Sequence, residues 1–313
     1  MKMSDLSMKK FFTYEQQLQH LKNKGLIIAD EEQAVKFLKK YSYYASISAY
    51  KDVFKKERNG NYIKGTELSH IITLYLLDRY LRDTVLHQIM IVERHIKSLY
   101  SYEFCSLFGD RQQDYLNANN YNYTQYQHQV NEYLVMVQEQ IRKPQKEYVS
   151  YNLKRYGEVP FWVLIHVLTF GNISKMYGFS SQKLQSQIAR QFGADVYSNK
   201  LLSMLQVLSK FRNVCAHGER LYSFHSRMEI EDMPLHSRLG ILKKNSEYVQ
   251  GKRDLFAVII CLKYLLDTEE FRLFVLELDN LMNVFFNKLS TDIVDKIKRK
   301  MGFPENWKDS CSL

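Results

Sequence analysis

The stretch from Leu68 to Phe104, LSHIITLYLLDRYLRDTVLHQIMIVERHIKSLYSYEF, carries the strongest structural signal in this chain of 313 residues. Its apolar residues recur at the three- and four-residue spacing that places them on one face of an α-helix. Neither glycine nor proline interrupts the stretch. The pattern therefore predicts one or two long helices between Thr66 and about Phe108.

The rest of the chain shows the same helical periodicity. Glycine (12) and proline (4) are scarce, and alternating strand patterns run for only a few residues. A first helix is expected from Thr13, whose side chain can form a capping box with Gln16, to a stop at Gly25. Further helices are predicted at 30–54, 127–153, 160–177, 181–192, 197–216, 252–267 and 270–299, with breaks at 55–65 and 109–126. These elements predict an all-α fold.

The turn-rich segment 55–65 (KKERNGNYIKG) is the expected domain boundary. We therefore expect an N-terminal helical region at 1–60, a helical core at 61–225 that carries the motif described below, and a C-terminal helical extension at 226–313.

Composition indicates a globular protein with an anionic partner. Apolar residues make up 45% of the chain, and the formal charge is +10. The four cysteines (Cys105, Cys215, Cys261 and Cys311) are far apart, so neither a disulfide framework nor a zinc site is expected. No Asp/Glu/His cluster has metal-ligand spacing. The N-terminus has no apolar signal core, and no apolar run approaches the ~18 residues that span a membrane. We therefore expect a cytoplasmic protein without metal, other cofactor or membrane contact.

A second stretch, FRNVCAHGERLY at 211–222, holds an arginine and a histidine with four residues between them. Such a pair can cleave RNA without metal. The histidine handles a proton at the 2′-hydroxyl or the leaving oxygen, and the arginine stabilises charge on the phosphate. Spacing alone is a weak signal, because Arg82–His87 and Arg220–His225 match it as well.

Local structure distinguishes these pairs. Residues five apart in a straight helix point about 140° from each other, so Arg82 and His87 should diverge in the middle of their helix. Arg212 lies in the last turn of its helix, and His217 precedes Gly218, which can adopt a left-handed cap. We therefore expect the turn to bring Arg212 and His217 to one face. The alternative is that both are ordinary capping or surface residues.

Three stretches together resemble the Abi-like abortive-infection family, a branch of the HEPN superfamily. RNVCAHGERLY at 212–222 is similar to its RN-x-x-AH-x-x-RL signature. GEVPFWVLIHVLTFGNISKMY at 157–177 and the segment 13–50 are similar to two further blocks of the family, and they lie in the right order. The resemblance covers roughly residues 11–225. One departure is Ala45-Ser46, where the family usually has Arg-Leu, so any role of that arginine is absent or displaced.

The resemblance implies a HEPN-like helical bundle, with additional N- and C-terminal helices, that acts as a toxin-like ribonuclease in phage defence. Such proteins are typically homodimers with a composite site, and they cut RNA without metal to leave a 2′,3′-cyclic phosphate. Carried onto this chain, Arg212 is the phosphate-binding cation, Asn213 the polar orienter and His217 the catalytic histidine. Arg220 also matches the signature and, with Lys210, is assigned a supporting RNA-binding role. A structured non-coding RNA is a further expected partner.

Two other function classes remain open. The same basic groups suit a non-catalytic protein that holds a structured non-coding RNA. A DNA-binding regulator is a third hypothesis, although no convincing helix-turn-helix pattern is present.

Tyrosine-rich segments at 114–133 and 142–157 mix aromatic rings with Lys and Arg. That composition suits single-stranded RNA, and exposed tyrosines on a solvated helix explain it equally well. Phe161 and Trp162, behind Pro160, are expected to lie in the core.

Overall fold

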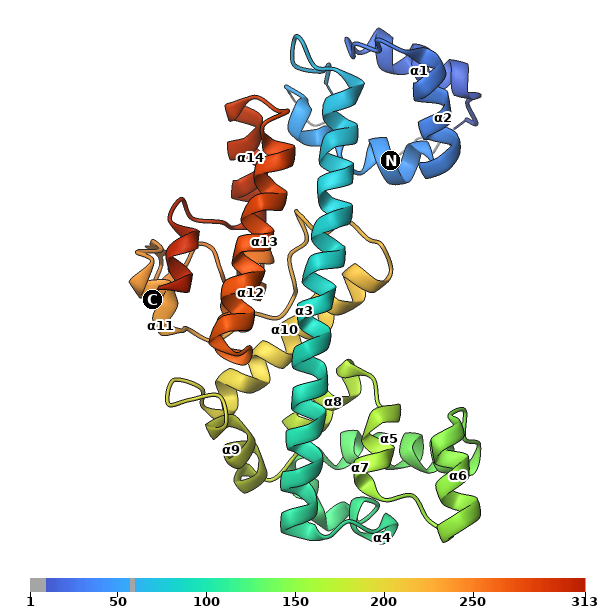
Figure 1. The fold of residues 1–313 in the computed structure, drawn as a ribbon, viewed down its shortest axis with the longest axis vertical. Helices are drawn as coiled ribbons and strands as arrows, with labels where there is room; N and C mark the ends of the chain where they lie inside the picture. Colours follow the sequence, from blue (N-terminus) through green and yellow to red (C-terminus); the bar gives the residue numbers. More distant parts are fainter. Residues whose placement is uncertain (1–9, 57–59, 313) are drawn as a thin grey trace, which may run out of the picture. The chain divides into compact units, whose positions relative to one another are not determined.

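Helices form nearly all of the regular structure in this computed structural model, which describes residues 10–56 and 60–312 (Figure 1). The α-helices are α1 (Tyr14–Asn23), α2 (Glu31–Tyr41), α3 (Leu68–Phe108), α4 (Gln112–Tyr115), α5 (Tyr123–Arg142), α6 (Glu147–Tyr156), α7 (Phe161–Leu164), α8 (Phe170–Gly178), α9 (Gln182–Arg190), α10 (Ser198–Ala216), α11 (Pro234–Arg238), α12 (Leu255–Leu265), α13 (Thr268–Phe286) and α14 (Thr291–Met301). The all-α, multi-helix fold class is confirmed.

Shorter elements complete the described part of the chain. They are the π-helix η1 (Tyr44–Ser48), the 3-10 helices η2 (Lys51–Phe54), η3 (Ala118–Asn120), η4 (Ile165–Val167) and η5 (Trp307–Cys311), and the antiparallel strands β1 (Lys243–Lys244) and β2 (Glu247–Tyr248). The first nine residues, where the sequence shows no signal core, lie outside the described residues.

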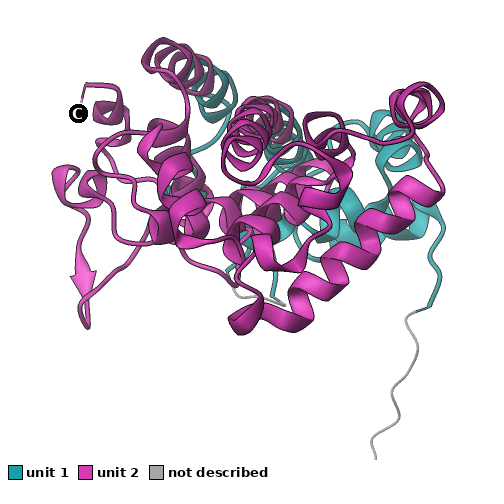
Figure 2. Ribbon diagram, turned by 90° about the horizontal axis from the view of Figure 1, so that it is seen from below, with its two compact units in different colours: residues 1–80, 279–297 teal, residues 81–278, 298–313 magenta. Residues whose placement is uncertain are grey.

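The chain divides into two compact units (Figure 2). Unit 1 comprises residues 1–80 and 279–297, and unit 2 comprises residues 81–278 and 298–313. The three regions expected from the sequence, with boundaries at 60 and 225, stay a prediction.

Unit 1 is built around buried residues of α1, α2 and the start of α3. The predicted capping box of α1 is present, since Gln16 N–H donates to Thr13 Oγ1 and Thr13 N–H donates to Gln16 Oε1. Tyr50 donates from its hydroxyl to Asp78 Oδ2 at 2.6 Å, so the buried carboxylate of α3 has a partner.

The predicted helix at 30–54 is wrong in its second half, because α2 ends at Tyr41. The backbone of Ser42 has φ +56°, a value that is incompatible with a right-handed α-helix. The Ser42 hydroxyl accepts a hydrogen bond from the backbone N–H of Ala45, and the next turn begins there. The chain continues as η1 and η2 instead.

The long helix is confirmed: α3 is continuous over 41 residues. Three other predicted helices are interrupted, and the helix predicted at 270–299 is one of them, because the chain forms two helices there, α13 and α14. The break between α5 and α6 contains Pro144, which cannot donate a helical hydrogen bond. Thr169 caps α8 by accepting the N–H of Asn172 and separates α8 from η4. Phe161 is buried as expected, but the prediction for Trp162 is wrong, because its side chain is half exposed on the one-turn helix α7.

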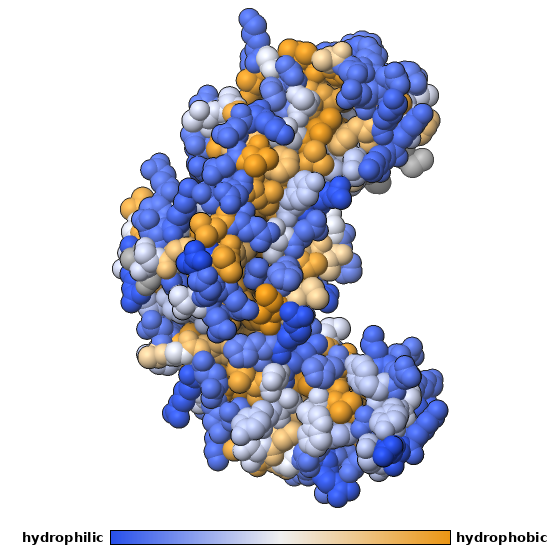
Figure 3. Space-filling model, viewed as in Figure 1, coloured by the Kyte–Doolittle hydropathy of each residue, from blue (hydrophilic) through white to orange (hydrophobic). Residues whose placement is uncertain are grey.

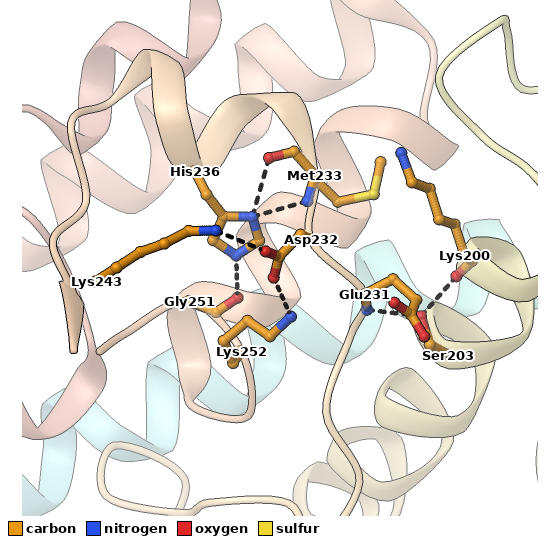
Figure 4. Close-up of polar contacts among 9 residues, drawn as sticks. All are labelled: Lys200, Ser203, Glu231, Asp232, Met233, His236, Lys243, Gly251 and Lys252. Atoms are coloured by element: carbon orange, nitrogen blue, oxygen red, sulfur yellow. Dashed lines mark hydrogen bonds and ion pairs between the residues drawn. The ribbon is translucent and has the colours of Figure 1, made fainter. Parts of the chain in front are cut away.

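Polar contacts hold the segment between α10 and α12 in place (Figure 4). Glu231 N–H donates to Ser203 Oγ of α10 at 3.0 Å. The His236 ring is fully buried, where Nδ1 accepts Met233 N–H at 3.0 Å and Nε2 lies 2.9 Å from the Gly251 carbonyl oxygen. Both contacts are satisfied by the neutral ring that carries its proton on Nε2.

Acidification is expected to destabilise unit 2 through His236. Burial lowers the pKa of His236 below its usual value of 6.5, against the opposing effect of its backbone hydrogen bonds to Gly251 and Met233. The unfolded chain therefore binds a proton at a pH where the folded chain does not, so stability is lost as pH falls below about 6.5. Melting curves at about pH 7.5 and about pH 5.5 should show a smaller drop in His236→Gln than in the wild type. An unchanged drop would contradict this, and His166→Gln, at an exposed histidine, is the matched control.

Candidate active site

The helix α10 positions the Arg–His motif. One face of α10 is buried, including Leu201, Leu205, Leu208 and Phe211, and it packs against α8, α9 and α12. The motif begins where this buried face ends, so its first residues stand on a rigid element.

The end of α10 is a Schellman motif. Gly218 has φ +69°, and its N–H donates to the Cys215 carbonyl at 3.2 Å. The next N–H, of Glu219, donates to the Val214 carbonyl at 3.0 Å. These two bonds satisfy carbonyls that a helix end leaves without partners. The expected left-handed cap at Gly218 is confirmed.

Gly218→Ala is expected to lower stability by about 1 kcal/mol, because an L side chain is strained at this φ. For a chain of this size the melting temperature should fall by about 1–2 °C. Gly171→Ala is the matched control: Gly171 lies inside α8 with ordinary φ, and an added Cβ would meet Thr169 Oγ1 at 3.8 Å. A fall of equal size in both variants would show that left-handed strain is not the cause.

The turn begins one residue too late to bring Arg212 and His217 to one face. His217 N–H still donates to the Asn213 carbonyl at 2.9 Å, which continues the helical pattern, and the φ of His217 is −91°. At helical spacing the two side chains leave the axis about 140° apart. Our expectation of convergence through the turn was therefore wrong. Lys210, Asn213 and His217, by contrast, share one exposed face at i, i+3 and i+7.

Arg212 is held against α3, which α10 crosses (Figure 1). Its side chain is 33% exposed, and Nε lies 3.7 Å from Glu93 Oε2. Nε is shielded from solvent and makes no hydrogen bond. Glu93 is nearly buried and forms a second ion pair with Lys97 Nζ at 2.8 Å. The Glu93 carboxylate thus orients Arg212 and also pairs with Lys97, so its negative charge is shared between the two cations.

A buried arginine anchors the chain just after the motif. Arg82 of α3 is 7% exposed, and its Nη1 donates to the Glu219 carbonyl at 3.1 Å. His87 is exposed on the same helix. The prediction that Arg82 and His87 do not act as a pair therefore agrees with their different exposure, since one side chain is buried and the other is open to solvent. Arg82 is instead a structural support of the loop beside His217.

The supporting residues lie at the edge of the motif. Lys210 and Arg220 are exposed, and the guanidinium of Arg220 lies over the ring of buried Tyr222, 5.9 Å from its centroid. Tyr222 and Leu221 are buried, which fixes the chain on the far side of the turn.

Sequence reasoning missed Glu93 and Arg82 as parts of this site. The sequence signal that could have found them is a charged residue at a position that the helical period of α3 assigns to its buried apolar face. Positions 82, 89, 93 and 96 recur at heptad-like spacing on α3, and Ile89 and Ile96 are fully buried. A charged residue on such a face is paired or functional far more often than not.

No group of three or more His, Cys, Asp or Glu side chains is placed to hold a metal ion in residues 10–56 and 60–312. Within the same residues, every helix is too short or too polar to cross a membrane.

A family model described as Abi-like protein matches residues 36–223, more than half of the chain. This range lies within the segment 11–225 that the resemblance covers. No curated protein and no solved structure matches the chain.

Proposed function

Because the chain belongs to the Abi-like protein family, we propose that it is a metal-independent endoribonuclease of the HEPN type that acts in abortive-infection defence against phage. The observation that carries the proposal is the pair of functional groups at the capped end of α10. His217 is exposed there, and Arg212 is oriented by Glu93 with a third of its side chain open to solvent.

RNA cleavage of this kind needs two proton transfers, one from the attacking 2′-hydroxyl and one to the departing 5′-oxygen. His217 takes the proton of the 2′-hydroxyl as its oxygen attacks the adjacent phosphorus, or gives a proton to the departing 5′-oxygen. Arg212 stabilises the negative charge that builds on the phosphate oxygens, and Asn213 orients the phosphate. The products are a 2′,3′-cyclic phosphate and a 5′-hydroxyl. Lys210 and Arg220 add positive charge for the RNA backbone.

The proposal includes a homodimer with a shared site, which the direction of the side chains favours. The side chains of Arg212 and His217 diverge along one helix. The reaction also needs two proton transfers, and one chain supplies a single histidine for them in this motif. A two-fold axis beside residues 212–217 doubles the groups, because symmetry places the same patch on both sides of the interface.

Cleavage by the purified protein is expected to persist in excess EDTA and to leave 2′,3′-cyclic phosphate ends. The reason is that proton transfer by His217 and charge stabilisation by Arg212 use side chains alone. The assay compares product ends with and without the chelator. Loss of cleavage on chelation, with recovery on addition of magnesium or manganese, would contradict the mechanism.

A second candidate function is a non-catalytic protein that holds a structured non-coding RNA. The observation that favours it is the same divergence of Arg212 and His217, which binding tolerates and catalysis within one chain does not. RNA that co-purifies with the chain and stays intact would support this candidate over the nuclease.

A further inference from the structure

The helix α6 and the one-turn helix α7 expose four large aromatic side chains. Their exposed fractions are 40% for Tyr148, 51% for Tyr151, 62% for Tyr156 and 50% for Trp162. We call these four residues the aromatic face. Tyr148 and Tyr151 lie one turn apart on α6, and Trp162 follows on α7. Rings of this size are more often covered in a folded protein, so four together indicate a binding surface.

Cations accompany these rings. The guanidinium of Arg155 lies 5.9 Å from the centroid of Tyr151 and 5.6 Å from that of Tyr156. The two rings are 6.4 Å apart and nearly perpendicular, at 80°. Arg155 therefore associates with both tyrosines while remaining exposed to solvent.

The charge of the segment is positive. Residues 142–158 contain five basic residues (Arg142, Lys143, Lys146, Lys154, Arg155) and two acidic ones (Glu147, Glu158). Arg142 and Lys143 are paired with Glu139, at 2.7 and 3.6 Å. Among the described residues, Lys146, Lys154 and Arg155 form no ion pair, so their charge is available to an anionic partner.

A cavity of about 420 Å³ opens beside the aromatic face. This volume is within the range of roughly 300–1,000 Å³ typical of small-ligand sites. Its lining includes Tyr156, Trp162, Asn152, Asp110, Arg111 and Glu158. Two aromatic walls suit a flat ring. The Asn152 amide can donate hydrogen bonds to the polar edge of that ring or accept them, and the carboxylates of Asp110 and Glu158 can accept them. Glu158 is itself paired with Arg111 Nε at 2.7 Å.

We propose that the aromatic face binds unpaired nucleotides of an RNA, with bases stacked on its rings and the backbone held by Lys154 and Arg155. The proposal rests on the proposed function, because it names the form of RNA that the protein takes. Stacking requires exposed base faces, which a duplex hides. Figure 3 shows mostly hydrophilic and intermediate side chains over α5 and α6, with few strongly apolar ones, which fits a polyanion better than a lipid surface.

Fluorescence anisotropy tests this with the full chain carrying His217→Ala, so that binding is read without cleavage. The probe is a labelled, unstructured oligoribonucleotide of about 12 nucleotides, compared with a hairpin of equal length. Tyr151→Ala and Tyr156→Ala are each expected to weaken binding of the unpaired probe roughly fivefold or more. Tyr151→Phe should retain the wild-type affinity within about twofold, since the ring is kept.

The salt dependence of Kd distinguishes the contribution of the basic side chains to RNA binding from that of the aromatic rings. Lys154→Gln should lower the slope of log Kd against log salt by roughly 0.7, while Tyr151→Ala leaves the slope unchanged. The matched control is Tyr197→Ala, another exposed tyrosine with a lysine (Lys200) over its ring at 5.0 Å. It should bind as tightly as the parent chain.

Three results would overturn the proposal: equal binding by the parent and the α6 variants, tighter binding of the hairpin than of the unpaired probe, and no RNA binding at all. The proposed nuclease is judged separately, by cleavage with the His217-intact chain. If the chain cleaves RNA and the α6 variants bind as tightly as the parent, the proposal for the aromatic face is rejected and the nuclease proposal stands. If binding depends on α6 and the chain does not cleave RNA, the nuclease proposal is rejected and the proposal for the aromatic face stands.

Discussion

His217→Ala and Arg212→Ala are each expected to reduce RNA cleavage by about 10²- to 10⁴-fold and to abolish growth toxicity. The size reflects the loss of a proton-transfer group in one case and of phosphate charge stabilisation in the other. His217 is exposed and Arg212 is a third exposed, so both variants should fold. Cleavage of a labelled RNA and thermal melting of each purified variant provide the measurement.

Two histidines serve as controls for that experiment. His87 matches the spacing rule and is exposed on α3, and His166 is exposed on η4. Replacing either one with alanine should leave cleavage unchanged. If His87→Ala abolishes cleavage by a folded protein while His217→Ala does not, the wrong motif has been assigned.

The whole population of dimers is expected to show about a quarter of the wild-type activity when wild-type and His217→Ala chains are co-expressed in equal amounts. Random assortment leaves about one dimer in four with both histidines, and a shared site needs both. The two chains carry different removable tags, so their ratio can be checked in the purified mixture. The cleavage rate per dimer is then compared with that of the wild type.

A mixture with His87→Ala is the matched control and should retain full activity. Activity near one half in the His217→Ala mixture would mean that each chain cuts with its own pair, and the shared site would have to be abandoned. Size-exclusion measurements on the same samples show whether dimers form at all.

Local patterns in the sequence predicted much of the fold. The apolar period of α3 and the capping box of α1 are contained in a few neighbouring residues, and both are confirmed. The end of α10 was also predictable, because Gly218 marks a left-handed position. The break at Ser42 was not, since a serine with positive φ leaves no trace in a helical pattern.

The surroundings of the motif depend on long-range contacts. Arg82 reaches the Glu219 carbonyl across 137 positions in the sequence, and Glu93 reaches Arg212 from the same helix. Spacing rules compare residues within one or two turns, so they cannot connect such pairs. The direction of His217 was misjudged for a related reason: whether the turn precedes or follows a residue is decided by individual hydrogen bonds.

The alternation of burial along residues 211–222 changes how genetic data on this protein should be read. In a saturation mutagenesis screen for loss of toxicity, changes at buried Val214, Leu221 or Tyr222 will act by lowering the amount of folded protein. Under the proposed function, changes at exposed Asn213 and His217 act on chemistry at normal abundance. Neighbouring positions with the same phenotype therefore have different causes, and protein level must be measured beside toxicity to separate them.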